Sequence, residues 1–258
     1  MPVNSQNKDA EALLKKGLDG LGFSYSDTQI NSFMTYLYEL KKWNKAYNLT
    51  ALKTDRDIII KHFLDSLLYL KVIQECSIEK ETFMPQRDTK GDENNPPVPP
   101  LLKGGEGGLS CRFLKIADAG TGAGFPGIPM KIMKPELDMT LIESSMKKVS
   151  FLRHIVRTLK ISGINILNSR IETLGENCKR SYDVIVSRAA FKIKDFIEKA
   201  CPYVKEDGIL VMSKGPGVFE EIKGLKDTGS KSIEKIIKLS LMNYERNLLL
   251  ITCKNLPL

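Results

Sequence analysis

A glycine-rich loop between an apolar run and a helical stretch constrains this chain more than any other part of its sequence. Glycine occupies positions 120, 122, 124 and 127 of the segment ADAGTGAGFPG, which spans residues 117–127. Glycine permits the positive φ angles of a tight turn and lets a ligand approach the backbone closely. A bare turn between a strand and a helix needs fewer glycines, so this loop is predicted to hold a nucleotide-like cofactor.

Short β-rich runs alternate with amphipathic helical stretches after residue 112. The runs predicted as strands are 113–117, 139–143, 164–167, 183–187, 208–213, 235–241 and 247–253. Such alternation predicts a parallel sheet with helices on both faces. No helical stretch separates the last two runs, so they are predicted to form a hairpin with its turn at 243–246. The expected fold class is α/β and Rossmann-like, with a mostly parallel seven-stranded sheet and an antiparallel final strand, as in class I methyltransferases that use S-adenosylmethionine.

The sequence divides into three regions. Residues 1–74 form an N-terminal helical region, in which Ser26 and Gln29 predict a capping box at the start of one helix. Residues 75–110 are rich in proline and glycine and are predicted to be a disordered insert. Residues 111–258 form the predicted Rossmann-like domain. The segment Asn44–Thr50 is predicted to interrupt the helical region because it is too polar to continue a helix.

The ordered parts of the chain are predicted to be basic. Lysine and arginine number 39 against 31 aspartates and glutamates, which gives a net charge of +8. The region 75–110 contains seven acidic and four basic residues, a net of −3, so the remainder carries +11. A nucleic acid is the usual partner of so basic a protein. The alternative is a solvated basic surface without a partner.

Other features of the composition argue against several classes of protein. The five cysteines show no CxxC spacing and are predicted to be reduced thiols in a cytosolic compartment. Only two histidines are present, which argues against a histidine-rich metal site. No apolar run is long enough to span a bilayer, and the first residues lack a signal-peptide pattern. We therefore expect a cytoplasmic monomer that uses neither a metal nor a membrane.

Two acidic residues bear on the identity of the cofactor. Asp118 lies at the start of the loop, and Glu143 ends the next predicted strand. A carboxylate about 20 residues beyond the loop binds ribose in dinucleotide sites as well, so Glu143 fits NAD or S-adenosylmethionine. Asp118 would repel a pyrophosphate but could meet the amino-acid moiety of S-adenosylmethionine, so it favours the methyl donor. Its alternative role is that of a helix-capping acid.

Charged residues follow three further strands at the carboxyl edge, where open α/β sheets bind ligands. Arg170 and Glu172 follow strand 164–167, although they could equally begin a helix. Arg188 follows an apolar run and is predicted to point into the crevice or to pair with an acid there. Lys214 repeats this pattern on the next strand. Two cations at adjacent strand ends suit a phosphate-bearing substrate such as RNA.

The N-terminal region carries a more specific signature, KWNKAYNLT at residues 42–50. Further motifs follow in order: KHFLDSL at 61–67, the glycine loop, KKVSFLR at 147–153, Ser187–Ala189 and Lys214–Pro216. Together they resemble the bacterial 16S rRNA guanine-N7 methyltransferase G family, also called glucose-inhibited division protein B. The resemblance covers the chain except for about 75–110.

The resemblance implies methyl transfer from S-adenosylmethionine to N7 of a guanine in the decoding-region hairpin of small-subunit rRNA. Matched to this sequence, the cofactor contacts of the family fall at Gly120, Phe125, Ile171, Glu172 and Arg188. The reasoning from the residues adds Asp118, Gly122 and Glu143 to the predicted cofactor site.

No catalytic residue is expected, because N7 of guanine has a free lone pair and the enzyme must mainly hold donor and acceptor in line. Arg188 is therefore assigned to holding the cofactor or a phosphate. Asn44, Asn48 and Lys214 are candidate substrate-binding residues. His62, Asp65 and Ser66 are expected to form a buried polar join between the helices and the sheet. The N-terminal cations are expected to form part of an RNA platform: Lys41, Lys42, Lys45, Arg56 and Lys61.

Two other functions stay open at this point. An NAD-linked oxidoreductase fits the glycine loop, since Gly122-x-Gly124-x-x-Gly127 also satisfies the dinucleotide pattern. A non-catalytic RNA-binding factor in ribosome assembly fits the charge, although an intact cofactor loop argues against it.

Overall fold

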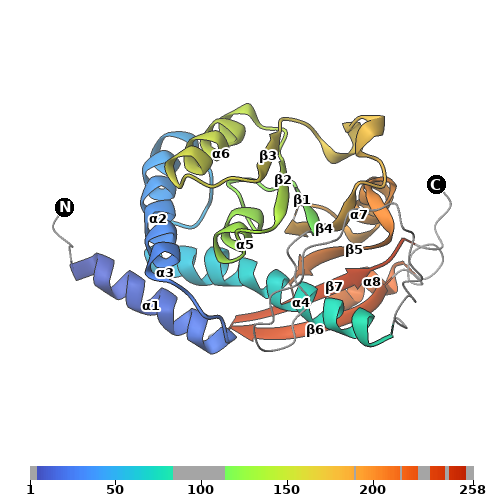
Figure 1. Cartoon of the computed structure of the whole chain (residues 1–258), viewed down its shortest axis with the longest axis horizontal. Coiled ribbons are helices and arrows are strands. Elements are labelled where there is room, and N and C mark those ends of the chain that lie inside the picture. Colours follow the sequence, from blue (N-terminus) through green and yellow to red (C-terminus); the bar gives the residue numbers. More distant parts are fainter. Residues whose placement is uncertain are drawn as a thin grey trace, which may run out of the picture.

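A seven-stranded sheet forms the centre of the computed structural model, which describes residues 5–83, 114–188, 190–215, 217–225, 233–241 and 244–253. Its strands lie in the order β3-β2-β1-β4-β5-β7-β6 (Figure 1). The strands are β1 (Lys115–Ala119), β2 (Asp138–Ile142), β3 (Ile164–Leu167), β4 (Tyr182–Arg188), β5 (Val204–Lys214), β6 (Ile233–Leu241) and β7 (Tyr244–Ile251). The first five are parallel, whereas β7 runs antiparallel to β5 and β6.

All seven predicted strands are present, with their ends shifted by a few residues. The predicted antiparallel hairpin of the last two is confirmed. Its predicted turn at 243–246 is wrong, because residues 244–246 belong to β7 and pair with β6, and residue 243 lies outside the described residues. The first five strands are parallel because a long connection separates each of them from the next. The predicted fold class is therefore confirmed.

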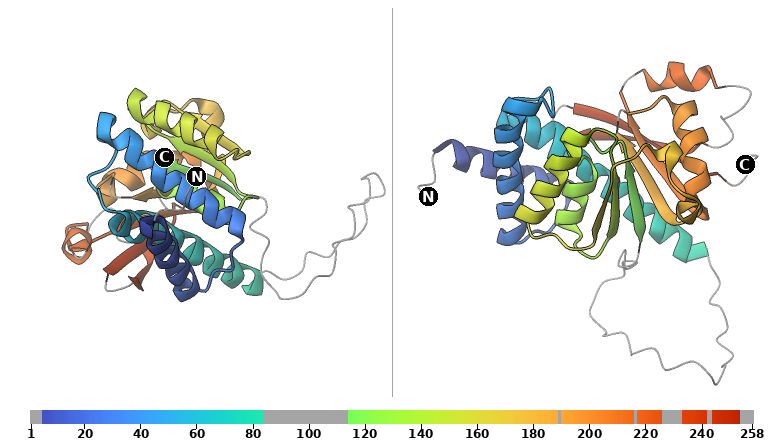
Figure 2. Two further views of the ribbon diagram at one scale, coloured as in Figure 1. Left: turned by 90° about the vertical axis from the view of Figure 1, so that its left-hand side faces the viewer. Right: turned by 90° about the horizontal axis from the view of Figure 1, so that it is seen from above.

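Helices occupy most of the connections and the N-terminal region. They are α1 (Ser5–Leu21), α2 (Asp27–Tyr47), α3 (Asp55–Ile58), η1 (Ile59–Leu64), α4 (Asp65–Phe83), α5 (Gly127–Met133), α6 (Met146–Thr158), η3 (Ile171–Thr173), η4 (Glu176–Cys178), α7 (Ile193–Ala200), η5 (Cys201–Tyr203) and α8 (Val218–Lys223). The segment η1 has π-helical geometry and joins α3 to α4. The N-terminal helices, α5 and α6 lie on one side of the sheet, and α7 and α8 on the other (Figure 2).

Alternate residues of the strands belong to two separate cores, because successive side chains of a strand point to opposite faces. Ile116 and Val184 pack under the N-terminal helices, whereas the neighbouring Ala117 and Ile185 pack under α7 and α8. The first core is the larger. The central strands are thus buried on both faces, as expected for a parallel sheet.

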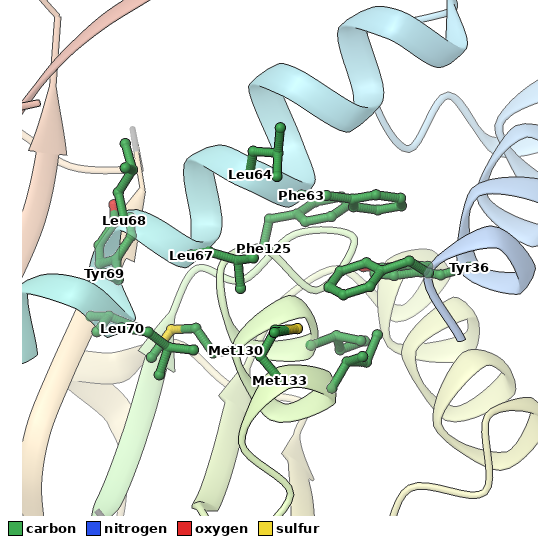
Figure 3. Close-up of a cluster of buried hydrophobic side chains, with 14 of the residues drawn as sticks. Tyr36, Phe63, Leu64, Leu67, Leu68, Tyr69, Leu70, Phe125, Met130 and Met133 are labelled. Carbon is green, nitrogen blue, oxygen red and sulfur yellow. The ribbon is translucent and has the colours of Figure 1, made fainter. Parts of the chain in front are cut away.

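Aromatic rings connect the N-terminal helices with the glycine loop. Tyr36 of α2 stacks on Phe125 with ring centroids 5.3 Å apart, and on Phe63 at the same distance. Met130 and Met133 of α5 fill the space below these rings (Figure 3). The hydroxyl of Tyr36 also donates a hydrogen bond to the carbonyl of Ala123 inside the loop. The N-terminal region is therefore part of the structure that holds the loop.

Two predictions concern the helix α2, and the structure confirms one of them and contradicts the other. The predicted capping box is confirmed: the Ser26 hydroxyl accepts from the Gln29 amide, and the Gln29 side chain accepts from the Ser26 amide. The helix it starts, however, continues to Tyr47 through the segment predicted to interrupt it. Asn44 compensates for its low helix propensity by binding both backbone groups of Thr50, at 2.9 and 3.0 Å. Asn48 then ends the helix in the left-handed conformation, φ 49°.

The last helix of the N-terminal region runs past residue 74. Residues 75–83, which composition assigned to the insert, continue α4 because glutamate and lysine are good helix formers. The rest of the predicted insert, residues 84–110, lies outside the described residues.

One cysteine pair contradicts the prediction of reduced thiols. Cys201 in η5 and Cys253 after β7 form a disulfide, with their Cα atoms 5.6 Å apart. The two residues are 52 positions apart, so only the fold brings them together. Cys178 is a free, half-buried thiol, and the side chains of Cys76 and Cys111 lie outside the described residues.

Candidate functional site: a pocket at the carboxyl edge of the sheet

The glycine loop leaves β1 and is fixed against the neighbouring strand. The amides of Gly120 and Thr121 both donate to the carbonyl of Ile142, at 3.0 and 3.1 Å. Gly120 and Gly122 have φ angles of 72° and 63°, which lie in the left-handed region. A side chain at Gly120 would also approach Cβ of Ala190 to 2.8 Å. Glycine is thus required there by conformation and by space.

Asp118 fixes the conformation of the glycine loop through hydrogen bonds to two of its residues. Its side chain is fully buried, and Oδ2 accepts from the Thr121 hydroxyl at 2.6 Å and from the Gly127 amide at 2.7 Å. Gly127 is the first residue of α5, so the helix-capping alternative for Asp118 is what the structure shows. Burial raises the pKa of this carboxyl to about 7, although both hydrogen bonds act in the opposite direction. Its Oδ1 has no partner among the described residues.

Glu143 connects the glycine loop with α6. Its Oε2 accepts from the Gly122 amide at 2.9 Å, and its Oε1 accepts from the Ser145 amide at 2.8 Å. The side chain is only 6% exposed, yet it lines an open pocket. A carboxylate offers about four lone pairs, so each oxygen can accept a further hydrogen bond from a ligand hydroxyl.

A pocket of about 490 Å³ lies beside the loop at the carboxyl edge of the sheet. This volume is within the range of small-molecule sites. Four predicted cofactor residues line it: Gly120, Glu143, Ile171 and Glu172. Other lining residues, which no sequence pattern singles out, come from the segments after β2, β3 and β4 and from α7: Ser144, Ser169, Lys192, Asp195 and Lys199. Lys199 forms an ion pair with Glu172 at 3.4 Å. The pKa of Glu172 is lowered mainly because its carboxylate accepts a hydrogen bond from the backbone amide of Glu172, and the ion pair with Lys199 lowers it further.

The remaining predicted cofactor residues do not line this pocket. Gly122 contributes its amide to Glu143, and Asp118 lies under the loop. The ring of Phe125 lies against His62, with centroids 4.3 Å apart, and belongs to the core of the N-terminal helices. Its neighbour Arg188 places its guanidinium 5.2 Å from the centre of the same ring.

Arg188 joins the sheet to the N-terminal helices. It donates to the carbonyl of Lys61 at 2.7 Å and lies 3.4 Å from Asp65. Asp65 is 1% exposed and also accepts from Nε of Arg246 at 2.9 Å. The expectation that Arg188 pairs with an acid, and the predicted buried polar join, are therefore confirmed. Burial, together with the charge of Arg188, lowers the pKa of His62 to about 3, so this histidine is neutral.

Lys214 points to the opposite face of the sheet from Arg188. It donates to the carbonyl of Phe191 at 2.8 Å and pairs with Glu221 of α8 at 2.9 Å. The two cations at adjacent strand ends thus do not form one phosphate site, because their side chains leave the sheet in opposite directions. Ala189 and Pro216 of the two motifs lie outside the described residues.

Tyr69 of α4 is a further residue near the site that was not predicted from the sequence. Its hydroxyl donates to the carbonyl of Ser187 at 2.8 Å and accepts from the amide of Ser213 at 3.1 Å. It thereby ties the ends of β4 and β5 to the N-terminal helices. No pattern in the sequence separates this tyrosine from a core residue.

The strand order and the site together define a class of protein. A sheet in the order 3-2-1-4-5-7-6, with an antiparallel seventh strand and a glycine loop after the first, is that of a Rossmann-like class I methyltransferase. Enzymes of this class take the methyl group from S-adenosylmethionine, which is the cofactor of this chain. In the described part of the chain, no helix is long and apolar enough to cross a membrane, and no group of histidine, cysteine or acidic residues could hold a metal ion.

Comparison with known proteins narrows this class to one family. The family described as rRNA small subunit methyltransferase G matches residues 29–80 and 109–249, so the chain belongs to it. The ribosomal RNA small subunit methyltransferase G of Geobacter sp. (strain M21) is 35% identical over 220 residues, which cover 85% of this chain and 84% of that protein. That of Alkaliphilus oremlandii is 33% identical over 230 residues, 87% of this chain and 82% of that protein.

Solved structures show a more distant similarity. The crystal structure of a SAM-dependent methyltransferase from Aquifex aeolicus aligns with a TM-score of 0.43 and 19% identity. The alignment covers 54% of this chain and 82% of that chain.

Proposed function

We propose that this chain methylates N7 of a guanine in the decoding-region hairpin of 16S rRNA, in the cytoplasm, with S-adenosylmethionine as donor. The observation that carries the proposal is the pocket beside the glycine loop, in a chain that belongs to the rRNA small subunit methyltransferase G family. The donor supplies an electrophilic methyl group. The rest of the site has to bind it, orient it and admit a base.

Glu143 is proposed to bind the ribose hydroxyls of the cofactor. Both of its oxygens are already fixed by backbone amides, so the carboxylate is held in one orientation at the wall of the pocket. Ile171, 2% exposed, and Glu172 would flank the adenine at the far end of the same pocket. Gly120 lets the ligand approach the backbone, because a Cβ there would already crowd Ala190.

Asp118 and Arg188 are proposed to act on the cofactor through the loop and not by direct contact. Asp118 fixes Thr121 and Gly127, the two sides of the turn. Arg188 lies over Phe125, which lies two residues before the start of α5 and packs under the N-terminal helices. Both residues therefore support the shape of the loop, which has to be rigid if donor and acceptor are to stay aligned.

The reaction needs no general base, because N7 of guanine attacks through its own lone pair. The product carries a positive charge on the guanine ring, so a free cation beside N7 would oppose the reaction. The engagement of Arg188 with Asp65 and of Lys214 with Glu221 fits this requirement, since each charge is compensated within the protein. Asn44, Asn48 and Lys214 remain candidate substrate-binding residues.

Small ribosomal subunits from a strain that lacks the gene provide the test. Purified protein and S-adenosylmethionine labelled with tritium in the methyl group should produce N7-methylguanine in their 16S rRNA, mapped by mass spectrometry. Subunits reconstituted with 7-deazaguanine at the mapped position should accept no methyl group, because carbon replaces N7. Methylation of the 7-deaza subunits at that nucleotide would assign another acceptor atom.

A matched binding measurement separates the two alternatives. We expect S-adenosylhomocysteine to raise the melting temperature and NAD to leave it unchanged; the reverse result would identify a dinucleotide enzyme. Tight binding of subunits without any methyl transfer would instead identify a non-catalytic assembly factor.

A further inference from the structure

Helices α2 and α6 lie side by side on the outer layer of the molecule and share one face (Figure 2). Trp43 of α2 packs between the two helices. Its ring centroid lies 5.6 Å from that of Phe151 and 4.9 Å from that of His154, both in α6. The carboxylate of Glu39 adds a half-buried hydrogen bond of 2.7 Å with Nε2 of His154. The two helices thus form one continuous surface.

Most of the charged residues on that surface are cations, and Asp55 is an acidic residue that lines a groove with Lys41, Lys42 and Lys45. No acidic residue occurs from position 40 to the end of α2 or anywhere in α6. Within the described residues, none of the cations on these two stretches forms an ion pair, apart from Lys41, which binds Asp55. The six that remain are Lys42, Lys45, Lys147, Lys148, Arg153 and Arg157. This is an arrangement that attracts a polyanion.

Two of these lysines occupy positions that do not stabilise α6. Lys147 and Lys148 lie in its first turn, where the helix dipole favours acidic side chains and disfavours cations. Ser145, at the N-cap position, makes no side-chain hydrogen bond to the helix. The start of α6 therefore places two lysines at the positive end of the helix dipole, and the carboxylate of Glu143 offsets a part of that positive charge through its bond to the Ser145 amide. The start of α6 lies next to the pocket, because Ser144, which precedes the cap residue, lines that pocket.

An exposed aromatic ring accompanies the cations. Tyr47, the last residue of α2, is 47% exposed, and its ring lies 5.3 Å from that of Trp43. Phe151, Trp43 and Tyr47 thus form a series of rings that runs from the core to the solvent. Met146, at the start of α6, is 60% exposed. An exposed, internally supported aromatic ring among cations is a typical stacking platform for an unpaired base.

We propose that the α2–α6 face, defined by Tyr47, Met146 and the six unpaired cations, is the docking surface for the RNA that flanks the target guanine. The cations contact phosphates, and Tyr47 stacks on an unpaired base beside the cofactor pocket. The inference rests on the proposed function and deepens it. It also differs from the platform expected from sequence, because Lys41 and Lys61 are engaged with Asp55 and Asp57, and α6 supplies most of the free charge.

Fluorescence anisotropy with a fluorescein-labelled transcript of the decoding-region hairpin tests the surface. The triple variant Lys147→Gln, Arg153→Gln and Arg157→Gln should weaken binding by at least about tenfold and reduce the slope of log Kd against log salt by about 2. A control triple variant, Lys8→Gln, Lys16→Gln and Arg180→Gln, removes the same charge from exposed sites elsewhere. It should change binding by less than about threefold.

The stacking role is tested separately. Tyr47→Leu should weaken binding by about 5- to 100-fold and leave the salt slope unchanged, whereas Tyr47→Phe should stay within about twofold of the unchanged protein. Affinity for S-adenosylhomocysteine, measured by calorimetry, should be the same in all variants, which shows that the cofactor site is intact.

Equal affinity of the α6 triple variant and its control overturns the docking surface, as does equal binding of Tyr47→Leu and Tyr47→Phe. In either case, methylation of small subunits by the unchanged protein would still uphold the proposed function. Conversely, the expected losses of binding together with no methyl transfer by the unchanged protein would leave the surface standing and reject the function.

Discussion

Nη1 of Arg188, at the end of β4, lies 3.4 Å from Oδ2 of Asp65, at the start of α4. The other oxygen of Asp65 accepts from Arg246 of β7 at 2.9 Å. One buried carboxylate therefore compensates cations from two strands and fixes both to the N-terminal helices.

Removal of the charge on Asp65 should destabilise the protein strongly. Asp65→Asn removes the buried negative charge that the half-buried Arg188 and Arg246 share, and breaking such an ion pair by changing one member typically costs about 3 to 5 kcal/mol. The free energy of unfolding from urea titrations measures the loss. As a control, Glu245→Gln removes an exposed ion pair to Lys238, and its effect should stay below about 1 kcal/mol. Equal effects of the two variants would contradict the structural role of Asp65.

Glu143→Gln should weaken binding of the cofactor. The amide group of glutamine cannot accept from both Gly122 and Ser145, so it cannot keep the orientation proposed to bind the ribose hydroxyls. A hydrogen bond lost from the bound cofactor costs about 1 to 3 kcal/mol. The dissociation constant for S-adenosylhomocysteine, from calorimetry, should rise by about 5- to 150-fold. Glu176→Gln, which changes a side chain that is 86% exposed, should leave it within about twofold. An unchanged constant in Glu143→Gln would remove this residue from the cofactor site.

Asp118 should make the stability of the protein depend on pH. Burial raises its pKa to about 7 in the folded state, whereas the unfolded chain has the ordinary value of 3.8. As the pH rises above 4, the unfolded state loses this proton first, so the free energy of unfolding falls until about pH 7 and is constant above it. Between pH 5 and pH 8 this residue contributes a decrease of about 2 to 3 kcal/mol.

Asp118→Asn isolates that contribution, since asparagine does not titrate. The difference in unfolding free energy between the variant and the unchanged protein should shift by the same amount in favour of the variant from pH 5 to pH 8. A difference independent of pH would show that the carboxyl is ionised throughout.

The disulfide should contribute to stability in the oxidised protein. It closes a loop of 52 residues, for which loss of chain entropy in the unfolded state predicts up to about 4 kcal/mol. Cys201→Ser should lower the urea midpoint to that of the protein treated with dithiothreitol, and dithiothreitol should not affect the variant further. Cys178→Ser, which changes a free thiol, serves as the control. Insensitivity of the unchanged protein to dithiothreitol would show that the bond is absent in solution.

The strands and the glycine loop could be predicted because their signals are local. An apolar run bounded by polar residues specifies a buried strand, and the glycines of the loop are needed for its own backbone. The length of α2 could not be predicted in this way. From the sequence alone, Asn44 is expected to disfavour a helix. The helix continues because the Asn44 side chain makes two hydrogen bonds with the backbone of Thr50.

The directions of Arg188 and Lys214 show a different limit. Arg188 has the same parity on β4 as Val184 and Val186, which pack under the N-terminal helices. Lys214 has the same parity on β5 as Leu210 and Met212, which pack under α7 and α8. Parity can be counted from sequence, but which face holds the helices and which the pocket depends on the assembled sheet. The disulfide could not be predicted from the sequence either, because only the assembled sheet brings Cys201 and Cys253 together.

The bonds of Asp65 also bear on how the chain folds during its synthesis. Its two partners come 123 and 181 residues later in the sequence. The N-terminal helices therefore leave the ribosome long before the strands on which they pack, and the aspartate lacks its first partner until β4 emerges and its second until β7 emerges. Contacts of such long separation form late and slowly, so a nascent chain that stops before Arg246 should remain open and prone to capture by chaperones.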